Sequence, residues 1–430
     1  MITTAFINIW NTRVGAIAWN PETDLVSFEY DAAFLNNNWD LSPIKMPISG
    51  AAKKIFSFPE LRGLNTFKGM PGLLADVLPD RYGNTLINTW LTQHGRPADS
   101  LNPIEKLCFI GNRGMGALEF EPLQPRINKS ASKIEISSLI EMAEGILSGR
   151  KDFSANLSLD DKKALVDILK VGTSAGGARA KAVIAYNPEN GEVRSGQAEV
   201  SKGFTHWIIK FDGVTDTQFG ASSGYGRVEM AYYLMALDAG IEMTECRLLE
   251  ENKRAHFMTK RFDRDTETGK LHVQSFCAMR HYDFNEVNSY SYEQLFETMR
   301  ILGLPYPQAE QLYRRMVFNV MGRNCDDHTK NFAFVMDKTG KWRLSPAFDV
   351  CHAYRPGSDW VSQHALSVNG KRTNITRFDV LEVARQMNIK KAETIVQQIA
   401  AVITNWLVYA EQVKVEKPLK EAIGKTLLVL

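Results

Sequence analysis

The most informative part of the sequence is a polar stretch, Arg323-Asn324-Cys325-Asp326-Asp327-His328-Thr329-Lys330-Asn331-Phe332, followed by Leu344-Ser345-Pro346-Ala347-Phe348-Asp349. Enzymatic phosphoryl transfer uses a carboxylate that accepts the proton of the attacking hydroxyl, an amide oxygen that binds Mg²⁺, and a later carboxylate that joins the metal to the phosphates. Asp326, Asn331 and Asp349 supply these groups in that order. The pattern therefore predicts a catalytic base at Asp326 and metal ligands at Asn331 and Asp349.

The same residues also fit an ordinary structural interpretation. Aspartate and asparagine are common helix caps and turn formers, so Asp326 and Asp327 could cap a helix while Asn331 lies in a turn. The spacing of an aspartate and an asparagine alone is also common by chance. Three features elsewhere in the chain favour the phosphotransfer interpretation.

Two of these features are a lysine and a glutamate that could form an ion pair. Lys210 lies in the apolar strand pattern Trp207–Phe211, where its side chain must reach solvent or meet an anion. Glu229 follows on the amphipathic pattern Arg227–Ala239. In kinases, a helix glutamate paired with a strand lysine holds the ammonium group on the phosphates of ATP. A solvated helix face is the alternative for Glu229.

The third feature is a glycine-rich segment, Gly172-Thr173-Ser174-Ala175-Gly176-Gly177-Ala178-Arg179-Ala180-Lys181. Glycines let backbone amides approach phosphate oxygens, and successive free N–H groups form an anion-binding nest. The segment matches neither of the common phosphate-loop patterns. It predicts a tight turn that either binds an anion or forms a flexible hairpin.

Composition predicts a globular protein with two or three domains. The chain has 430 residues and is 44% hydrophobic, which is enough for several cores. Its 51 Lys and Arg nearly balance 49 Asp and Glu, so charge gives no strong attraction to nucleic acid or membranes. Without a signal-peptide pattern or a stretch of about 18 apolar residues, we expect a cytoplasmic protein. Five scattered cysteines without a CxxC pair disfavour disulfides and zinc.

The order of the hydrophobic patterns predicts an α+β, bilobal fold with an accessory part. We expect a β-rich N-terminal accessory subdomain at residues 1–125 and a mixed N-lobe with the phosphate loop at 126–285. An all-helical C-lobe with the catalytic and metal-binding loops would occupy 286–430. The polar stretch Gln124–Lys133 marks the first boundary.

Local patterns predict individual elements within these parts. The expected strands are Ala5–Trp10, Leu25–Tyr30, Gly116–Pro122, Ala182–Tyr186, Trp207–Phe211, Glu245–Glu250 and His256–Asp263. A helical pattern covers Gly72–Trp90. Ser138 and Ser158 each precede an acidic residue by three positions, which predicts that they are helix N-caps.

Several motifs together resemble the HipA-type Ser/Thr kinase toxins. They are the glycine-rich segment, Thr205-His206-Trp207-Ile208-Ile209-Lys210-Phe211, Lys260-Arg261-Phe262-Asp263-Arg264, the Asp326 stretch and the Asp349 stretch. The N-terminal part is also similar, in Leu78-Pro79-Asp80 and in Ile110-Gly111-Asn112-Arg113-Gly114-Met115-Gly116-Ala117. The resemblance covers almost the whole chain and implies a bilobal, protein-kinase-like fold.

The resemblance also implies roles for residues that spacing alone does not single out. The additional positions implied in ATP binding are Gly176, Gly177, Ala178, Lys181, Lys260, Phe262 and His328. The first three would give backbone amides to the phosphate loop, with Lys181 close behind. Lys260 to Phe262 would form the hinge against adenine, with contacts through the backbone, and His328 would lie near the phosphates.

Ser174 matches the serine that HipA kinases autophosphorylate, and Thr173 is an alternative acceptor. A phosphate of about −2 charge on this loop would repel the nucleotide that the loop must hold. Phosphorylation at Ser174 is therefore expected to switch the protein off.

The implied activity is ATP- and Mg²⁺-dependent phosphorylation of protein serine or threonine by the toxin of a toxin–antitoxin pair. The implied partners are a small helix-turn-helix antitoxin resembling HipB, operator DNA contacted mainly through it, and a protein substrate such as an aminoacyl-tRNA synthetase. A dimer bridged by the antitoxin is also implied. A small-molecule phosphotransferase and an inert corepressor scaffold stay open, although the intact Asp326, Asn331, Asp349 and Lys210 disfavour the scaffold.

Overall fold

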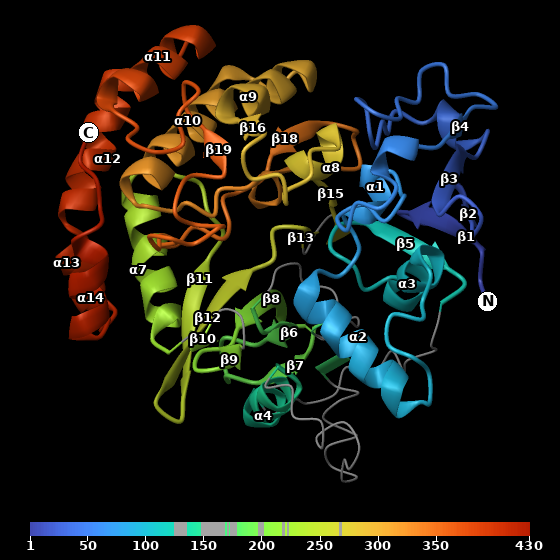
Figure 1. Cartoon of the computed structure of the whole chain (residues 1–430), viewed down its shortest axis with the longest axis horizontal. Coiled ribbons are helices and arrows are strands. Elements are labelled where there is room, and N and C mark those ends of the chain that lie inside the picture. Colours follow the sequence, from blue (N-terminus) through green and yellow to red (C-terminus); the bar gives the residue numbers. More distant parts are fainter. Residues whose placement is uncertain are drawn as a thin grey trace.

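The computed structural model describes residues 1–123, 136–147, 168–169, 172, 179–196, 202–216, 220–221, 223–265 and 269–430. Figure 1 shows N-terminal strands on one side of the molecule, a second sheet below the centre and a group of C-terminal helices on the other side. In the part of the chain so described, no helix is both long and apolar enough to cross a bilayer. The predicted α+β class is confirmed.

The N-terminal part is built on an antiparallel sheet of order β4-β3-β2-β1-β5. Its strands are β1 (Thr4–Ile9), β2 (Thr12–Asn20), β3 (Leu25–Tyr30), β4 (Ile55–Phe56) and β5 (Leu118–Glu121). Burial alternates along β1, where Ile7 and Ile9 are fully buried and Asn8 is not. The strands predicted in residues 5–10, 25–30 and 116–122 are confirmed.

The helices that follow the first four strands are α1 (Gly72–Ala75), α2 (Arg81–Gln93) and α3 (Pro103–Ile110), with short 3₁₀ turns η1 (Phe34–Asn36) and η2 (Pro59–Leu61) before them. The helical patterns expected at Gly72–Trp90 are confirmed, and they form two helices. Pro79 separates α1 from α2 because it lacks an amide donor and disfavours helical backbone in the residue before it.

A second antiparallel sheet has the order β11-β12-β8-β6-β7. Its strands are β6 (Lys181–Tyr186), β7 (Val193–Ser195), β8 (Thr205–Lys210), β11 (Cys246–Glu251) and β12 (Arg254–Lys260), and the helices packed around it are α4 (Ile136–Leu147) and α7 (Tyr225–Asp238). Two small hairpins pair β9 (Thr215–Asp216) with β10 (Gly220–Ala221) and β13 (Arg264–Asp265) with β14 (Gly269–Lys270). The predicted strands and the helix near Arg227–Ala239 are confirmed.

The start of α7 lies unusually close to this sheet. A Cβ atom on Gly226 would stand 1.9 Å from the Ala255 carbonyl oxygen of β12, so only glycine permits this approach. One N-cap prediction is wrong: α4 already runs at Ile136, which places Ser138 inside the helix rather than before it. The second predicted cap, Ser158, lies outside the described residues.

The C-terminal part is mainly helical. Its helices are α8 (Phe276–Arg280), α9 (Tyr292–Ile301), α10 (Tyr306–Met321), α11 (Arg377–Met387), α12 (Ala392–Thr404), α13 (Trp406–Gln412) and α14 (Lys417–Gly424), with η3 (Thr329–Asn331) between them. The strands are β15 (His272–Ser275), β16 (Tyr290–Ser291), β17 (Ala333–Met336), β18 (Trp342–Leu344) and β19 (Leu366–Ser367). The expected all-helical lobe needs this correction, because the apolar run of β17 is fully buried between β15 and β18.

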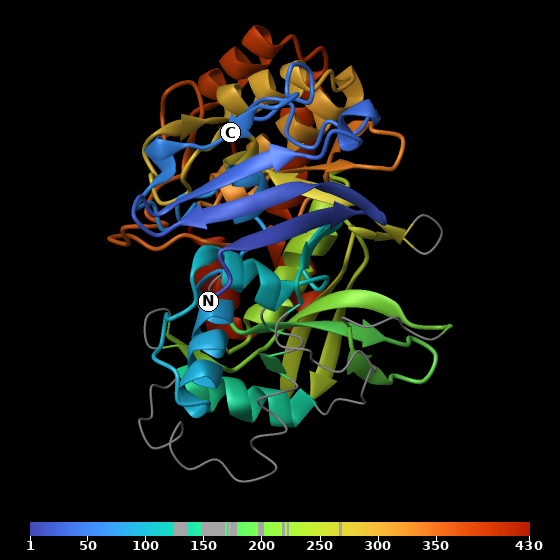
Figure 2. The ribbon, with the colours of Figure 1, turned by 90° about the vertical axis from the view of Figure 1, so that its right-hand side faces the viewer.

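Among the described residues, three hydrophobic cores lie within these parts. One lies under the N-terminal sheet, one under the second sheet, and the largest among α7 and the C-terminal helices. Figure 2 shows the ribbon of the same parts from the side. Tyr82, Leu86 and Leu91 of α2 belong to the core of the second sheet, although α2 precedes that sheet by many residues. Each such buried side chain contributes about 1.5–3 kcal/mol, so α2 is firmly attached to the N-lobe. The division at residues 125 and 285 stays a prediction.

Candidate active site

Lys210 is the centre of a charged cluster at the end of β8. Its Nζ atom lies 2.6 Å from Glu229 Oε2 on α7 and 2.6 Å from Asp349 Oδ1, which follows β18. The inner position of β8, between β6 and β12, leaves 16% of the lysine side chain exposed. Burial alone would lower the pKa of Lys210, but Asp349 and Glu229 raise it above its ordinary value. The lysine therefore stays charged and joins two carboxylates from distant parts of the chain.

Asp349 reaches this cluster in an unusual backbone conformation. Its φ of 51° lies in the left-handed region, which costs about 1–2 kcal/mol for a residue with a Cβ atom. Burial alone would raise the pKa of Asp349, but Lys210 and Lys181 hold it below its ordinary range. The carboxylate is ionised, and with 35% of the side chain exposed it remains accessible to a ligand.

Asp326 and Asn331 lie beside the cluster, in the loop that contains η3. Asn331 Nδ2 donates a hydrogen bond of 2.7 Å to the Asp326 carbonyl oxygen, which fixes the amide and turns its own oxygen the other way. His328 Nε2 is 3.7 Å from Asp326 Oδ1. Desolvation raises the pKa of Asp326, His328 lowers it and Asp349 raises it again, with a net upward shift. A base whose pKa is nearer neutrality is better matched to proton transfer, and 49% of this side chain is exposed.

These residues fit a metal ion with a bound triphosphate. Among the described residues, no group of three or more His, Cys, Asp or Glu side chains could hold a metal by itself. Mg²⁺ in phosphotransfer sites is instead held by one or two carboxylates together with substrate phosphates. The Asp349 carboxylate and the Asn331 amide oxygen are ligands of the required kind. A small hollow beneath them is lined by Arg315, Asn319, Asn324, Asp327, Asn331, Phe332, Ala347, Phe348, Asp349 and Val350.

The other predicted ATP contacts are only partly brought to this site. Lys181 is buried on β6 directly opposite Lys210, so both lysines face the same cluster. Phe262 packs on Phe348 with ring centroids 5.7 Å apart, beside Asp349. The Lys260 amide instead donates to the Glu245 carbonyl, and the Lys260 carbonyl accepts from Thr244 Oγ1. The backbone N–H and C=O groups of Lys260, which would form the predicted hinge contact with adenine, are therefore already hydrogen-bonded within the protein.

The predicted phosphate loop is not part of the described structure. Thr173, Ser174, Gly176, Gly177 and Ala178 lie outside the described residues, so their roles stay predictions. The chain is described again from Arg179, whose guanidinium lies 4.8 Å from the Tyr225 ring centre at the start of α7. The segment thus leads to the same end of α7 that carries Glu229.

The loop around Asp326 is held from behind by a buried network that the sequence did not single out. Asp327 Oδ2 accepts hydrogen bonds from the Tyr292 hydroxyl at 2.8 Å and from His364 Nδ1 at 2.9 Å, and Asp327 Oδ1 accepts from the Ala365 amide at 2.8 Å. Burial alone would lower the pKa of His364, but Asp327 raises it to about 10. The pair is therefore ionic, and it fixes the residue next to Asp326. The adjacent aspartates Asp326 and Asp327 were the sequence signal for this network, although nothing local indicates which of the two carboxylates points inward.

Arg315 plays a similar part under the predicted metal-binding loop. It lies on α10, is 4% exposed, and donates from Nη2 to the Ser345 carbonyl oxygen at 2.7 Å. That carbonyl belongs to the segment that ends at Asp349, so the arginine holds the loop against α10. Burial lowers the pKa of Arg315 to about 10, with Glu242 opposing the shift. Helical periodicity gave no sign of this residue, because it stands among apolar neighbours.

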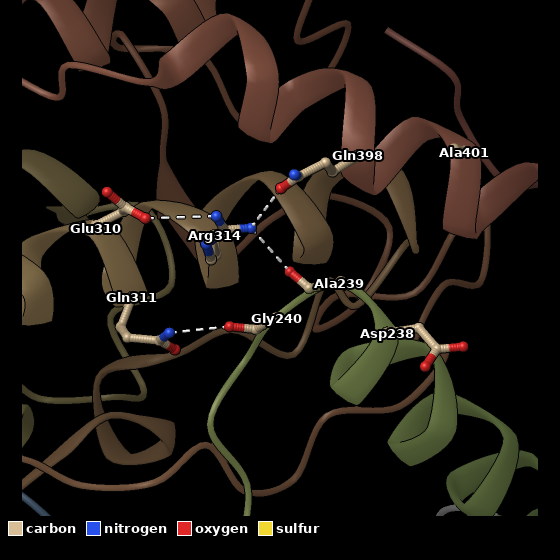
Figure 3. Close-up of a pocket in the computed structure, with 8 residues that line it drawn as sticks. All are labelled: Asp238, Ala239, Gly240, Glu310, Gln311, Arg314, Gln398 and Ala401. Atoms are coloured by element: carbon tan, nitrogen blue, oxygen red, sulfur yellow. Dashed lines mark hydrogen bonds and ion pairs between the residues drawn. The ribbon is translucent and has the colours of Figure 1, made fainter.

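The larger hollow among the described residues lies elsewhere, at the far end of α7 (Figure 3). There Arg314 Nη1 donates to the Ala239 carbonyl oxygen and to Gln398 Oε1, each at 3.0 Å. Gln311 Nε2 donates to the Gly240 carbonyl oxygen at 2.9 Å. These bonds satisfy the carbonyls at the end of α7, so the polar side chains serve the fold.

Comparison with known families agrees with the arrangement around Lys210. A model of the HipA N-terminal domain matches residues 5–121, and a model of the HipA-like C-terminal domain matches residues 173–407. The second match alone covers more than half of the chain. This chain belongs to the HipA family.

Two known proteins illustrate the range of similarity to this HipA-family chain. HipA of Shewanella oneidensis MR-1, solved as a toxin–antitoxin complex with HipB and operator DNA, superposes with a TM-score of 0.66 over 98% of this chain and 94% of its own. Their identity is 14%, so this likeness shows the fold alone. The putative kinase Y4dM of Sinorhizobium fredii is 26% identical over 209 residues, which are 44% of this chain. The match covers 48% of that curated relative, so the chain spans about half of its length.

Proposed function

We propose that this HipA-family chain is an ATP- and Mg²⁺-dependent serine/threonine protein kinase that acts in the cytoplasm as the toxin of a toxin–antitoxin module. One observation carries the proposal: Lys210 Nζ lies 2.6 Å from both Glu229 and Asp349, next to the loop of Asp326 and Asn331. A strand lysine that meets a helix glutamate and a second carboxylate, with a further acidic side chain nearby, is the arrangement that holds nucleotide phosphates and Mg²⁺ in kinases, and it supports the proposal.

Each residue of the cluster has a definite task in this proposal. Asp326 accepts the proton from the Oγ atom of a substrate serine or threonine as that oxygen attacks the γ-phosphate. Lys210 places its charge on the nucleotide phosphates, and Glu229 keeps it there. Asn331 and Asp349 would hold Mg²⁺, which supplies positive charge to the phosphates when bound. His328, whose Nε2 atom is 3.7 Å from Asp326 Oδ1, would lie near the phosphates.

Family membership supports a proposal for the regulation and the partners of the chain. Ser174, or Thr173, would receive a phosphate from the chain itself, and the added charge would expel the nucleotide. The antitoxin would be a small helix-turn-helix protein similar to HipB, with operator DNA bound mainly through it. A translation component such as an aminoacyl-tRNA synthetase would be the target, and a dimer would form across the antitoxin.

The test is transfer of labelled γ-phosphate from ATP to the purified full-length chain in Mg²⁺, with mass spectrometry of the peptide that contains Ser174. The wild type should label this peptide, and Asp326→Ala should not, while its far-UV circular dichroism and unfolding temperature stay close to the wild type. Asp238→Ala is a matched control, because Asp238 is exposed at the opposite end of α7 from Glu229. Equal labelling by wild type and Asp326→Ala would contradict the proposal.

A further inference from the structure

An ion pair joins the N-terminal part of the chain to the catalytic loop. Lys330 Nζ lies 2.5 Å from Asp80 Oδ1, although the two residues are 250 positions apart. The lysine side chain is 13% exposed and the aspartate side chain 19%. The pair is therefore mostly shielded from water. In such an environment an ionic contact is stronger than at the surface.

Lys330 is well placed to control the geometry of the catalytic loop. It is the middle residue of η3, between His328 and Asn331, and its amide donates to His328 Nδ1 at 3.3 Å. Asn331, the next residue, donates to the Asp326 carbonyl oxygen. The Lys330 ammonium group also lies 5.0 Å from the Phe284 ring centre. Fixing the Lys330 side chain thus fixes the turn that carries Asn331, the candidate metal ligand. The hydrogen bond from Asn331 to Asp326, the candidate base, is fixed with it.

Asp80 is itself held in place to make this contact. It stands at the N-cap position of α2, yet its carboxylate makes no capping bond to the first turn of that helix. Asn84 Nδ2 donates to the carbonyl oxygens of Pro79 at 2.6 Å and Asp80 at 3.1 Å, which holds the turn before α2. An N-cap aspartate normally gives its carboxylate to the helix. Here the carboxylate is directed to Lys330.

The rest of α2 packs against the second sheet, on the other side of the predicted nucleotide site. Its side chains Tyr82 and Leu86 lie in the core of the second sheet. A Cβ atom on Gly172, where the glycine-rich segment begins, would lie 2.5 Å from Leu86 Cδ1 and 3.3 Å from Tyr82 Cε1. Figure 1 shows α2 running from the neighbourhood of α1 down along the second sheet. One helix therefore contacts the base of the predicted phosphate loop and, through Asp80, the catalytic loop.

We propose that Asp80 is a positioning residue for phosphoryl transfer, and that it sets the catalytic loop relative to α2. This inference rests on the proposed kinase function. The N-terminal part then helps to position the catalytic loop, in addition to supporting the fold. Asp80 touches neither substrate nor nucleotide in this account. It acts through Lys330.

A purely stabilising role for the pair is less consistent with the rest of this interface. Asp76 of the turn after α1 accepts hydrogen bonds from the Ser275 amide at 2.6 Å and the Ser275 hydroxyl at 2.7 Å. The Gly72 amide donates to His281 Nε2 at 3.0 Å. These contacts already dock the N-terminal part on the C-lobe. Loss of the Asp80 carboxylate should therefore leave the two parts docked and disturb only the loop.

The test compares the full-length chain with Asp80→Asn, Asp80→Glu, Lys330→Met and the double variant Asp80→Asn/Lys330→Met. Glu119→Gln is the matched control, because the pair Lys270–Glu119 at 2.7 Å also joins the N-terminal sheet to a later hairpin but lies outside the catalytic loop. Two quantities are measured for each variant. They are the initial rate of γ-phosphate transfer to the peptide that contains Ser174 at several Mg·ATP concentrations, which gives kcat and KM, and the deuterium uptake of the peptide from Asp326 to Phe332 without nucleotide.

Asp80→Asn should lower kcat by about tenfold to a hundredfold, as small displacements of catalytic groups do, with little change in KM. The same variant should raise deuterium uptake in the catalytic-loop peptide. Asp80→Glu should recover most of the activity, and the double variant should be no worse than either single one. Glu119→Gln should resemble the wild type in both measurements.

Normal kcat and normal uptake in Asp80→Asn would overturn the inference, as would an equal loss of kcat in Glu119→Gln. A wild-type chain that transfers no phosphate would refute the proposed function instead. The uptake measurement would then still decide whether Asp80 orders the catalytic loop.

Discussion

Two polar regions lie at opposite ends of α7, and they use their charged groups differently. At the far end, Arg314 and Gln311 bind the backbone carbonyls of Ala239 and Gly240, where the helix stops. At the near end, Lys210 faces two carboxylates, and neither of them serves a backbone group of that helix. The far end has the larger hollow. The proposed function therefore rests on the convergent charges at the near end and not on the size of a cavity.

The largest effect should come from removing the cation at the near end. Lys210→Met should lower phosphate transfer by roughly 10²–10³-fold, because an electrostatic contact to the phosphates is lost. Glu229 and Asp349 would then lose the ammonium group that lies between them, so the double variant Lys210→Met/Glu229→Gln separates misfolding from lost chemistry. It should fold like the wild type and remain inactive in the same transfer assay. Recovery of activity in the double variant would show that Lys210 is only structural.

A smaller effect, on stability, should come from the buried pair behind the catalytic loop. The folded pKa of His364 is about 10, above the ordinary histidine value of about 6.5. A raised pKa stabilises the fold fully below the unfolded value, and this contribution is lost as pH rises through the folded value. The wild type should therefore exceed His364→Asn in free energy of unfolding by the largest amount near pH 6.

This difference should shrink by on the order of 3 kcal/mol towards pH 10. Urea unfolding at several pH values measures it, with Arg385→Ala as a control that changes an exposed charge on α11. A difference that does not change with pH would mean that His364 is neutral and that Asp327 is held by hydrogen bonds alone.

The smallest effect should come from the far end of α7. Arg314→Met removes the hydrogen bond to the Ala239 carbonyl and should cost about 1 kcal/mol of unfolding free energy. Phosphate transfer should stay within the error of the wild-type rate. A large loss of activity in Arg314→Met would break the contrast between the two ends of the helix.

The sequence predicted those parts of the fold that local patterns determine. Alternating residues in β1 and β3 and the apolar run of β6 mark strands, because one face or both faces of each strand are buried. The helical patterns at Gly72–Trp90 correspond to two helices, because Pro79 interrupts the helical backbone between them. Ser138 was wrong because a capping pattern also occurs inside helices. Short strands such as β17 were missed within a mainly helical lobe.

The candidate site was predictable where its residues carry a characteristic spacing, as Asp326 and Asn331 do. The contacts of Asp80 with Lys330 and of His364 with Asp327 were not predictable, because they depend on how distant segments meet in space. The resemblance included Asp80 among its motifs but gave it no role. The assigned roles of Asp326, Asn331, Asp349, Lys210 and the phosphate-loop residues stay predictions until tested.

The central claim is that Lys210, Asp326, Asn331 and Asp349 surround one metal-bound triphosphate. Its most direct test is the affinity for ATP, titrated by calorimetry with Mg²⁺ and with a chelator, for wild type and Asp349→Asn. The wild type should bind ATP at least about tenfold more tightly with Mg²⁺, because the ion joins the Asp349 carboxylate to the phosphates. Asp349→Asn should lose most of this gain. The same gain in both proteins would contradict the account.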